Sequence, residues 1–137
     1  MRRALVTGAS AGIGAAFAER LARDGYDVIL VARGRERLEA LARRLRDETG
    51  SAAQVLAADL TQPTQLLQVE QKLAADGDVE FLVNSAGFVT VGCFDALDPD
   101  REEAEIRLNV LALTRLTRTA LPAMLSRLSW QIMFPTR

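Results

Sequence analysis

A chain of 137 residues can bury one hydrophobic core, so the length predicts a single domain over residues 1–137. A net charge of −1, with acidic and basic residues scattered along the chain, gives no basic stripe for a nucleic acid. One cysteine, Cys93, and no histidine exclude an internal disulfide framework and argue against a metal site. Because no apolar run approaches the roughly 20 residues of a membrane helix, we expect no membrane partner and a cytoplasmic location.

The first predicted unit is a strand, a glycine-rich turn and a helix. Residues 4–6 form a short apolar run that is typical of a buried strand. After the turn, Ile13, Phe17 and Leu21 recur at helical spacing, which predicts that they share the buried face of a helix that Gly25 ends. Strand, glycine turn and helix therefore follow in the order that a dinucleotide phosphate site requires.

The turn itself, residues 7–14, carries three spaced glycines. Gly8 permits a tight turn, Gly12 lets the main chain approach a pyrophosphate, and Gly14 allows close packing of the helix on the strand. The free N–H groups at the start of the helix would then face the phosphates. The alternative is a plain turn, since turns and helix caps also collect glycine. We interpret the run as a phosphate-binding turn with contacts from Gly8, Ser10, Ala11, Gly12, Ile13 and Gly14.

Strands and helices alternate along most of the chain. Apolar runs at residues 28–31, 55–57 and 81–83 predict three more buried strands, with helices between them. Thr61 is the expected N-cap of the third helix, which tolerates Pro63 in its first turn. Short apolar strands that alternate with helices predict an α/β fold: a Rossmann-type, doubly wound parallel sheet in three αβα layers.

A long helix and an unusual tail end the chain. After a loop over residues 88–99, a helical pattern places five residues on one predicted buried face: Ile106, Val110, Leu113, Thr117 and Met124. The tail, residues 129–135, lacks the glycine turn and the β-branched strand that we would expect next. It is interpreted either as the result of truncation or a changed reading frame, or as a divergent strand with Trp130, Ile132 and Phe134 on one side.

Arg33 is predicted to select the cofactor. In dinucleotide-binding folds, a carboxylate at the tip of the second strand binds the 2′-hydroxyl of NAD. Here Ala32 and Arg33 occupy that tip, and a guanidinium can bind a 2′-phosphate through paired N–H donors. We therefore expect NADP rather than NAD. The alternative is an ordinary surface arginine, and Ala11 supplies no second basic group in the glycine turn.

Two more strand ends offer cofactor contacts. Asp59 can accept a hydrogen bond from the adenine amino group while Leu60 lies along the ring, although an N-cap or turn aspartate is the alternative. Residues 84–87 follow the fourth strand, where Gly87 lets the main chain pass close to the nicotinamide ribose and Asn84 can tie neighbouring strands together. A plain turn from strand to loop is the alternative for this segment.

From residue 3 to about residue 125, the chain resembles the N-terminal part of a classical short-chain dehydrogenase/reductase. The run 7–14 matches the family's TGxxxGxG turn, Asp59-Leu60 its adenine contact, and Asn84-Ser85-Ala86-Gly87 its NNAG element, with Ser85 in place of the second Asn. Asn109 matches the family's catalytic Asn. The resemblance implies an oxidoreductase that transfers hydride between NADP(H) and a carbonyl or alcohol, with nicotinamide-ribose contacts from Asn84, Ala86 and Gly87 and with homo-oligomeric assembly.

The family's catalytic Ser and Tyr-x-x-x-Lys pair lie after its fifth strand, and this chain lacks them. Tyr26, before the second strand, and Lys72, on the third helix, cannot be assigned to that pair, and Ser126 and Ser129 precede the expected fifth strand. We expect a sheet truncated after the fourth or fifth strand, with an exposed edge, a tendency to aggregate and no catalysis. The alternatives are an NADP-binding remnant or interaction module, or another Rossmann enzyme such as an adenosyl-dependent methyltransferase.

Overall fold

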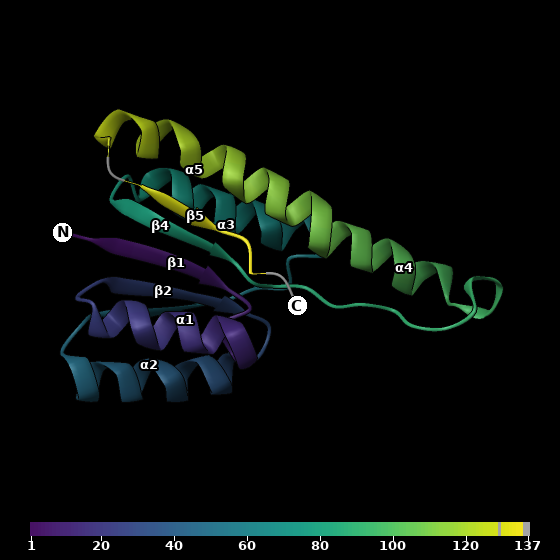
Figure 1. Ribbon diagram of the computed structural model, residues 1–137, viewed down its shortest axis with the longest axis horizontal. Coiled ribbons are helices and arrows are strands. Elements are labelled where there is room, and N and C mark those ends of the chain that lie inside the picture. Colours follow the sequence, from purple (N-terminus) through teal and green to yellow (C-terminus); the bar gives the residue numbers. More distant parts are fainter. Residues whose placement is uncertain (129, 136–137) are drawn as a thin grey trace.

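A computed structural model describes residues 1–128 and 130–135 as a parallel sheet between two layers of helices (Figure 1). In chain order the elements are β1 (Arg3–Thr7), α1 (Gly12–Arg23), β2 (Asp27–Ala32), α2 (Arg35–Thr49), β3 (Ala53–Ala57), α3 (Pro63–Ala75), β4 (Val79–Asn84), a 3₁₀ turn (Phe94–Ala96), α4 (Pro99–Ile106), a π-helical segment (Arg107–Ala112), α5 (Leu113–Arg127) and β5 (Gln131–Met133). Within these described residues, no helix has the length and apolarity required to cross a membrane.

The sheet has the strand order β3-β2-β1-β4-β5, and every pairing is parallel. Helices α1 and α2 lie on one face, and α3 and α5 lie on the other (Figure 1). The order therefore reverses between β1 and β4, which is where ligands bind in open α/β sheets. The predicted Rossmann-type fold is confirmed.

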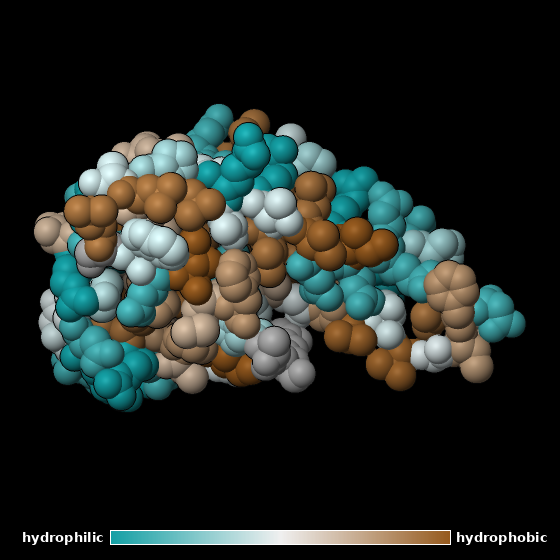
Figure 2. All heavy atoms as spheres, turned by 45° about the horizontal axis from the view of Figure 1, so that its top comes forward, coloured by the Kyte–Doolittle hydropathy of each residue, from teal (hydrophilic) through white to brown (hydrophobic). Residues whose placement is uncertain are grey.

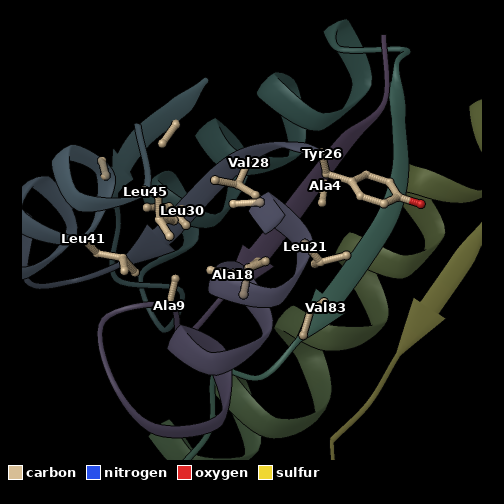
Figure 3. Packing of buried hydrophobic residues seen from close by; sticks show 14 of the residues in the cluster. Ala4, Ala9, Ala18, Leu21, Tyr26, Val28, Leu30, Leu41, Leu45 and Val83 are labelled. Atoms are coloured by element: carbon tan, nitrogen blue, oxygen red, sulfur yellow. The ribbon is translucent and has the colours of Figure 1, made fainter. Parts of the chain in front are cut away.

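The strands are buried on both faces because their alternating side chains enter two separate cores. Ala4 and Val6 pack toward α1 and α2, together with Val28 and Leu30 of β2 (Figure 3). Leu5, between them in sequence, enters the core on the other face with residues of α3 and α5. Fully burying an aliphatic side chain of this kind contributes about 1.5–3 kcal/mol relative to exposure. Continuous apolar runs therefore suit these central strands.

The predicted buried face of α1 is wrong at its start. Ile13 is 40% exposed, whereas Gly14, Ala18 and Leu21 are buried. Glycine and alanine let the helix approach the sheet closely, so Gly14 and Ala18 lie at the contact together with Leu21. Ile13 lies instead at the open N-terminal end of the helix.

The predicted face of the long helix is also wrong in its first half. Ile106 and Val110 are 61% and 57% exposed, while Met124 is fully buried. Two causes contribute. The α4 end extends beyond the sheet, so no strand covers it (Figure 1), and the π-helical segment changes the angular position of every later residue. The buried positions follow a spacing of four: Ala112, Leu116, Ala120 and Met124.

Thr61 does not cap α3. Gln62 occupies the N-cap position, and the helix begins at Pro63, as expected for a residue without an N–H. The Thr61 hydroxyl instead donates to Asp59 Oδ1 at 2.7 Å. Because that hydroxyl is engaged in the turn before the helix, it is not the cap we predicted.

The tail forms a strand where it is described. β5 pairs in parallel with β4, and Ile132 lies opposite Leu82 and packs, half-buried, against the core. Gln131 and Met133 are exposed, but Trp130 and Phe134 are each 44% exposed as well, so only Ile132 follows the alternation that the divergent-strand interpretation predicted. Leu128, immediately after α5, adopts a left-handed conformation with φ 59°, where a glycine is more usual. Ser129 lies outside the described residues.

Candidate dinucleotide-binding site

The predicted cofactor-binding segments meet at the carboxyl edge of the sheet. In register, Thr7 at the end of β1 lies opposite Val31 of β2 and Asn84 of β4. Val31 in turn lies opposite Leu56 of β3. The predicted site residues lie in the segments that follow these four strands. These segments therefore start side by side, near the point between β1 and β4 where the strand order reverses.

The Thr7 hydroxyl joins the ends of β1 and β4. It donates to the Val83 carbonyl oxygen at 3.3 Å and accepts from the backbone N–H groups of Ser85 and Ala86, both at 3.1 Å. Thr7 is 1% exposed. These bonds therefore replace the hydrogen bonds to water that the buried polar groups lose when the chain folds. Sequence patterns gave Thr7 no role of its own; a hydroxyl at the end of an apolar strand was the available signal.

Two glycines of the turn are required by close backbone contacts. A Cβ at Gly8 would lie 2.8 Å from the backbone N of Ala86 and the backbone C and O of Ser85. A Cβ at Gly14 would lie 2.7 Å from the carbonyl carbon of Gly8 and closer still to its oxygen. The turn, the loop after β4 and the start of α1 therefore pack backbone against backbone, with no room for a side chain at either glycine.

Gly12 differs, because its missing side chain faces open space. Its φ is +57°, and nothing lies within 4 Å of the position that a Cβ would take. Ala11, at the N-cap of α1, makes no side-chain capping bond. The start of this 12-residue helix thus combines backbone N–H donors, a favourable macrodipole and free space. These features fit a phosphate group. At Gly8 and Gly14, in contrast, backbone atoms of the protein occupy the space beside the glycine.

Arg33 is exposed at the end of β2 and forms no ion pair within the described part of the chain. Asp59 is already engaged: its Oδ1 accepts from the backbone N–H of Thr61 at 3.0 Å and from the Thr61 hydroxyl. The turn role that we left as an alternative for Asp59 is therefore present. An adenine contact by Asp59 and Leu60 stays a prediction, and Leu60 is 5% exposed.

Asn84 ties β4 to a helix, not to the neighbouring strand as we expected. Its Nδ2 donates to Thr117 Oγ1 of α5 at 3.1 Å. The reason is the position of α5, which covers this face of β4 and presents a hydroxyl to the strand end. Asn84 thereby fixes the start of the loop that carries Ala86 and Gly87.

Asn109 holds the same loop from the π-helical segment. Its Oδ1 accepts from the Phe88 N–H at 3.1 Å, and its Nδ2 donates to the Phe88 carbonyl oxygen at 2.7 Å. A Cβ at Gly87 would lie 2.8 Å from that Oδ1, so a larger residue there would displace the Asn109 amide. The amide side chain therefore positions the loop backbone. The proton-relay role that the resemblance implies for Asn109 stays a prediction.

Glu105 adds a second contact that the sequence patterns missed. One turn before Asn109, its Oε2 accepts from the backbone N–H of Thr90 at 2.8 Å and from the Thr90 hydroxyl at 2.5 Å. The hydrogen bond from the Thr90 hydroxyl, and to a smaller extent that from the Thr90 backbone N–H, holds the pKa of the Glu105 carboxyl below its ordinary value. No motif in the sequence indicates this contact between Thr90 and Glu105.

Tyr26 and Lys72 lie away from this edge, as we expected from the sequence. Tyr26 precedes β2, and its hydroxyl accepts from Arg2 at the amino end of the sheet. Lys72 Nζ lies 3.5 Å from Asp76, which also binds Arg3. Ser126 donates to the Ala123 carbonyl oxygen on the exposed end of α5. Neither the tyrosine nor the lysine is placed to move a proton at the candidate site.

A doubly wound sheet with a packed glycine turn at its strand reversal defines a Rossmann-type domain. The chain belongs to the short chain dehydrogenase family, whose model matches residues 2–134. Membership of this family sets aside the methyltransferase alternative.

The relatives agree with this assignment and are about twice as long. A short-chain dehydrogenase from Sphingobium yanoikuyae, solved with NADPH, is 45% identical with a TM-score of 0.94 over 98% of this chain and 52% of that one. L-Sorbose reductase from Gluconobacter frateurii, solved with NADPH and L-sorbose, is 30% identical with a TM-score of 0.89 over 97% and 51%. An uncharacterised oxidoreductase from Staphylococcus saprophyticus is 34% identical over 94% of this chain and 56% of its own length.

Proposed function

We propose that this chain is the cofactor-binding part of an oxidoreductase that interconverts carbonyl and alcohol groups with NADP(H). The observation that carries the proposal is the open, positively polarised start of α1 at Gly12, framed by the tightly packed Gly8 and Gly14. Relatives solved with NADPH or NADP support the choice of cofactor.

Each strand end has a part in this proposal. Residues 10–13 face the pyrophosphate, Arg33 binds the 2′-phosphate, and Asp59 with Leu60 contacts the adenine. The loop at residues 86–87, held by Thr7 and Asn109, passes the nicotinamide ribose. When bound, the cofactor supplies the hydride chemistry, and the protein supplies binding and orientation.

We also propose that the 137-residue chain binds the cofactor without turnover. Protonation of a carbonyl oxygen requires a positioned acid, and the one tyrosine and one lysine of the sequence lie at the opposite edge of the sheet. An NADP-binding protein without catalysis is therefore favoured over an active enzyme for this chain. In a longer family member, additional groups deliver the proton.

Calorimetric titration with NADPH, NADH and S-adenosylmethionine tests the binding, and a panel of ketones with NADPH tests turnover. We expect NADPH to bind most tightly, S-adenosylmethionine not to bind, and NADPH not to be oxidised. Arg33→Asp should move the preference toward NADH, because a carboxylate repels the 2′-phosphate. Turnover would contradict the second proposal alone, whereas absence of nicotinamide cofactor binding would contradict the first.

A further inference from the structure

The turn from β2 into α2 carries three arginines that differ in their partners. Arg35 lies 3.8 Å from Glu39, one helical turn further along α2. Arg33 and Arg37 form neither an ion pair nor a side-chain hydrogen bond within the residues that the structure describes, and both are exposed. Two guanidinium groups near the tip of β2 are thus available to an anion.

The Arg37 side chain lies against Gly34, the residue that follows Arg33. It is the third residue of α2, and side chains on a helix are inclined toward the helix N-terminus. A Cβ placed at Gly34 would lie 4.0 Å from both Cβ and Cδ of Arg37, so the aliphatic part of that side chain lies against residue 34. Gly34 directly follows Arg33, and the Arg37 side chain therefore begins its course beside the tip of β2.

The local charge balance favours an anion in spite of the acidic residues present. Within residues 33–39, Glu39 is engaged by Arg35, and Glu36, in the first turn of α2, is the other carboxylate. Gly34 at the N-cap supplies no side-chain oxygen, so it does not compete for the first N–H groups of α2. The two positive charges of Arg33 and Arg37 exceed the single negative charge of Glu36.

We propose that Arg37 is a second specificity-determining residue, which binds the 2′-phosphate of NADP(H) together with Arg33. The inference rests on the proposed function. It supplies from α2 the second basic group that Ala11 does not supply in the glycine turn. Bidentate guanidinium donors suit a phosphate dianion, whereas the 2′-hydroxyl of NAD(H) has no charge for Arg37 to engage.

The test is calorimetric titration of the 137-residue chain and its variants with NADPH, NADH and adenosine 2′,5′-bisphosphate. Arg37→Gln should weaken NADPH and the bisphosphate by about threefold to fivefold and leave NADH unchanged, the factor expected for one exposed charge pair. Arg37→Lys should retain part of the affinity. Arg43→Gln removes the same charge from an exposed position further along α2 and should leave the affinities for all three ligands unchanged.

The outcomes separate this inference from the proposed function. If Arg33→Gln lowers the ratio of NADPH to NADH affinity and Arg37→Gln does not, the inference is overturned and the proposed function stands. Equal weakening of NADPH and NADH by Arg37→Gln would also overturn it, because that result indicates a structural role. If the unmodified chain binds neither cofactor, both the proposed function and the inference fail.

Discussion

The β1–α1 turn and the helical stretch from α4 through the π-helical segment to α5 are built differently. In the turn, Gly8 and Gly14 bring backbone against backbone, and Thr7 is 1% exposed. On the helix, Ile106 and Val110 remain more than half exposed and line an open groove of about 760 Å³. Figure 2 shows hydrophobic atoms on the surface of this protruding end.

The two regions differ in whether their side chains and backbone find packing partners among the described residues. The turn finds its packing partners inside β1, α1 and the loop after β4, so it tolerates almost no added volume. The helix presents the apolar side chains of Ile106 and Val110 without such partners among the described residues. We therefore expect substitutions in the turn to have large effects and those on the helical side to have smaller ones.

Gly14→Ala should have the largest effect. The added Cβ would lie 2.7 Å from the Gly8 carbonyl carbon, and both neighbours are backbone, so the turn or the helix must move. We expect a loss of about 3 kcal/mol in unfolding free energy, a Tm lower by roughly 10 °C and no NADPH binding. Thermal unfolding followed by circular dichroism measures this. A variant with unchanged Tm would show that the packing is looser than described.

Gly12→Ala should abolish binding while largely sparing the fold. Its Cβ meets open space, so the structural cost is the strain of φ +57°, about 1 kcal/mol. The same Cβ would occupy the space proposed for the pyrophosphate, and NADPH affinity should fall at least about tenfold. Gly25→Ala is the matched control: φ is +85°, its Cβ also meets open space, and it lies away from the site. Equal NADPH affinity in both variants would contradict the phosphate assignment.

The sequence predicted most of the fold because local pattern and tertiary context agree there. Leu38, Leu41, Ala42 and Leu45 recur at helical spacing in the sequence and are all buried in α2, and Gly50 follows that helix in a left-handed conformation. The errors arise where the context decides. No single-helix pattern reveals that α4 extends past the sheet, or that Val110 lies in a π-helical segment before Leu116.

The sequence predicted which positions form the candidate site, but not the hydrogen bonds that join them. The glycine spacing indicated Gly8 and Gly14, and their close contacts agree with it. The bonds from Thr7 to residues 85 and 86 join groups that are more than 75 residues apart in the chain, and Thr90–Glu105 has no motif at all. Such long-range polar contacts depend on the assembled sheet, so sequence periodicity does not contain them.

Asn109→Ala should have an intermediate effect. It removes both hydrogen bonds to Phe88 and leaves two partly buried backbone groups without that partner, which costs about 1–3 kcal/mol. Amide hydrogen exchange at Phe88 and Thr90 should accelerate while β1 stays protected. Thr119→Ala, which removes a hydroxyl bonded only within α5, is the control. Unchanged exchange at Phe88 would show that Asn109 does not hold the loop.

Leu128→Gly should stabilise the chain. Leu128 is 93% exposed, so its side chain contributes little, while φ 59° costs a non-glycine residue about 1 kcal/mol. Glycine should raise Tm by roughly 3–5 °C. Leu128→Ala removes most of the side chain but keeps the Cβ, and should bring no such gain. If alanine and glycine stabilise equally, the strain is not the cause.

Glu105→Gln should have the smallest effect, and only a pH-dependent one. Because Thr90 lowers the folded-state pKa of Glu105, the ionised carboxylate stabilises the fold above its unfolded pKa of about 4.3, and that contribution is lost as pH falls through the lower folded value. Tm measured from pH 7 down to pH 3 should therefore fall less steeply in the variant. Glu102→Gln, on the same helix and without a side-chain hydrogen bond among the described residues, should keep the original slope. Parallel slopes for Glu105→Gln and the unmodified chain would mean that the Thr90 contact does not fix the loop in solution.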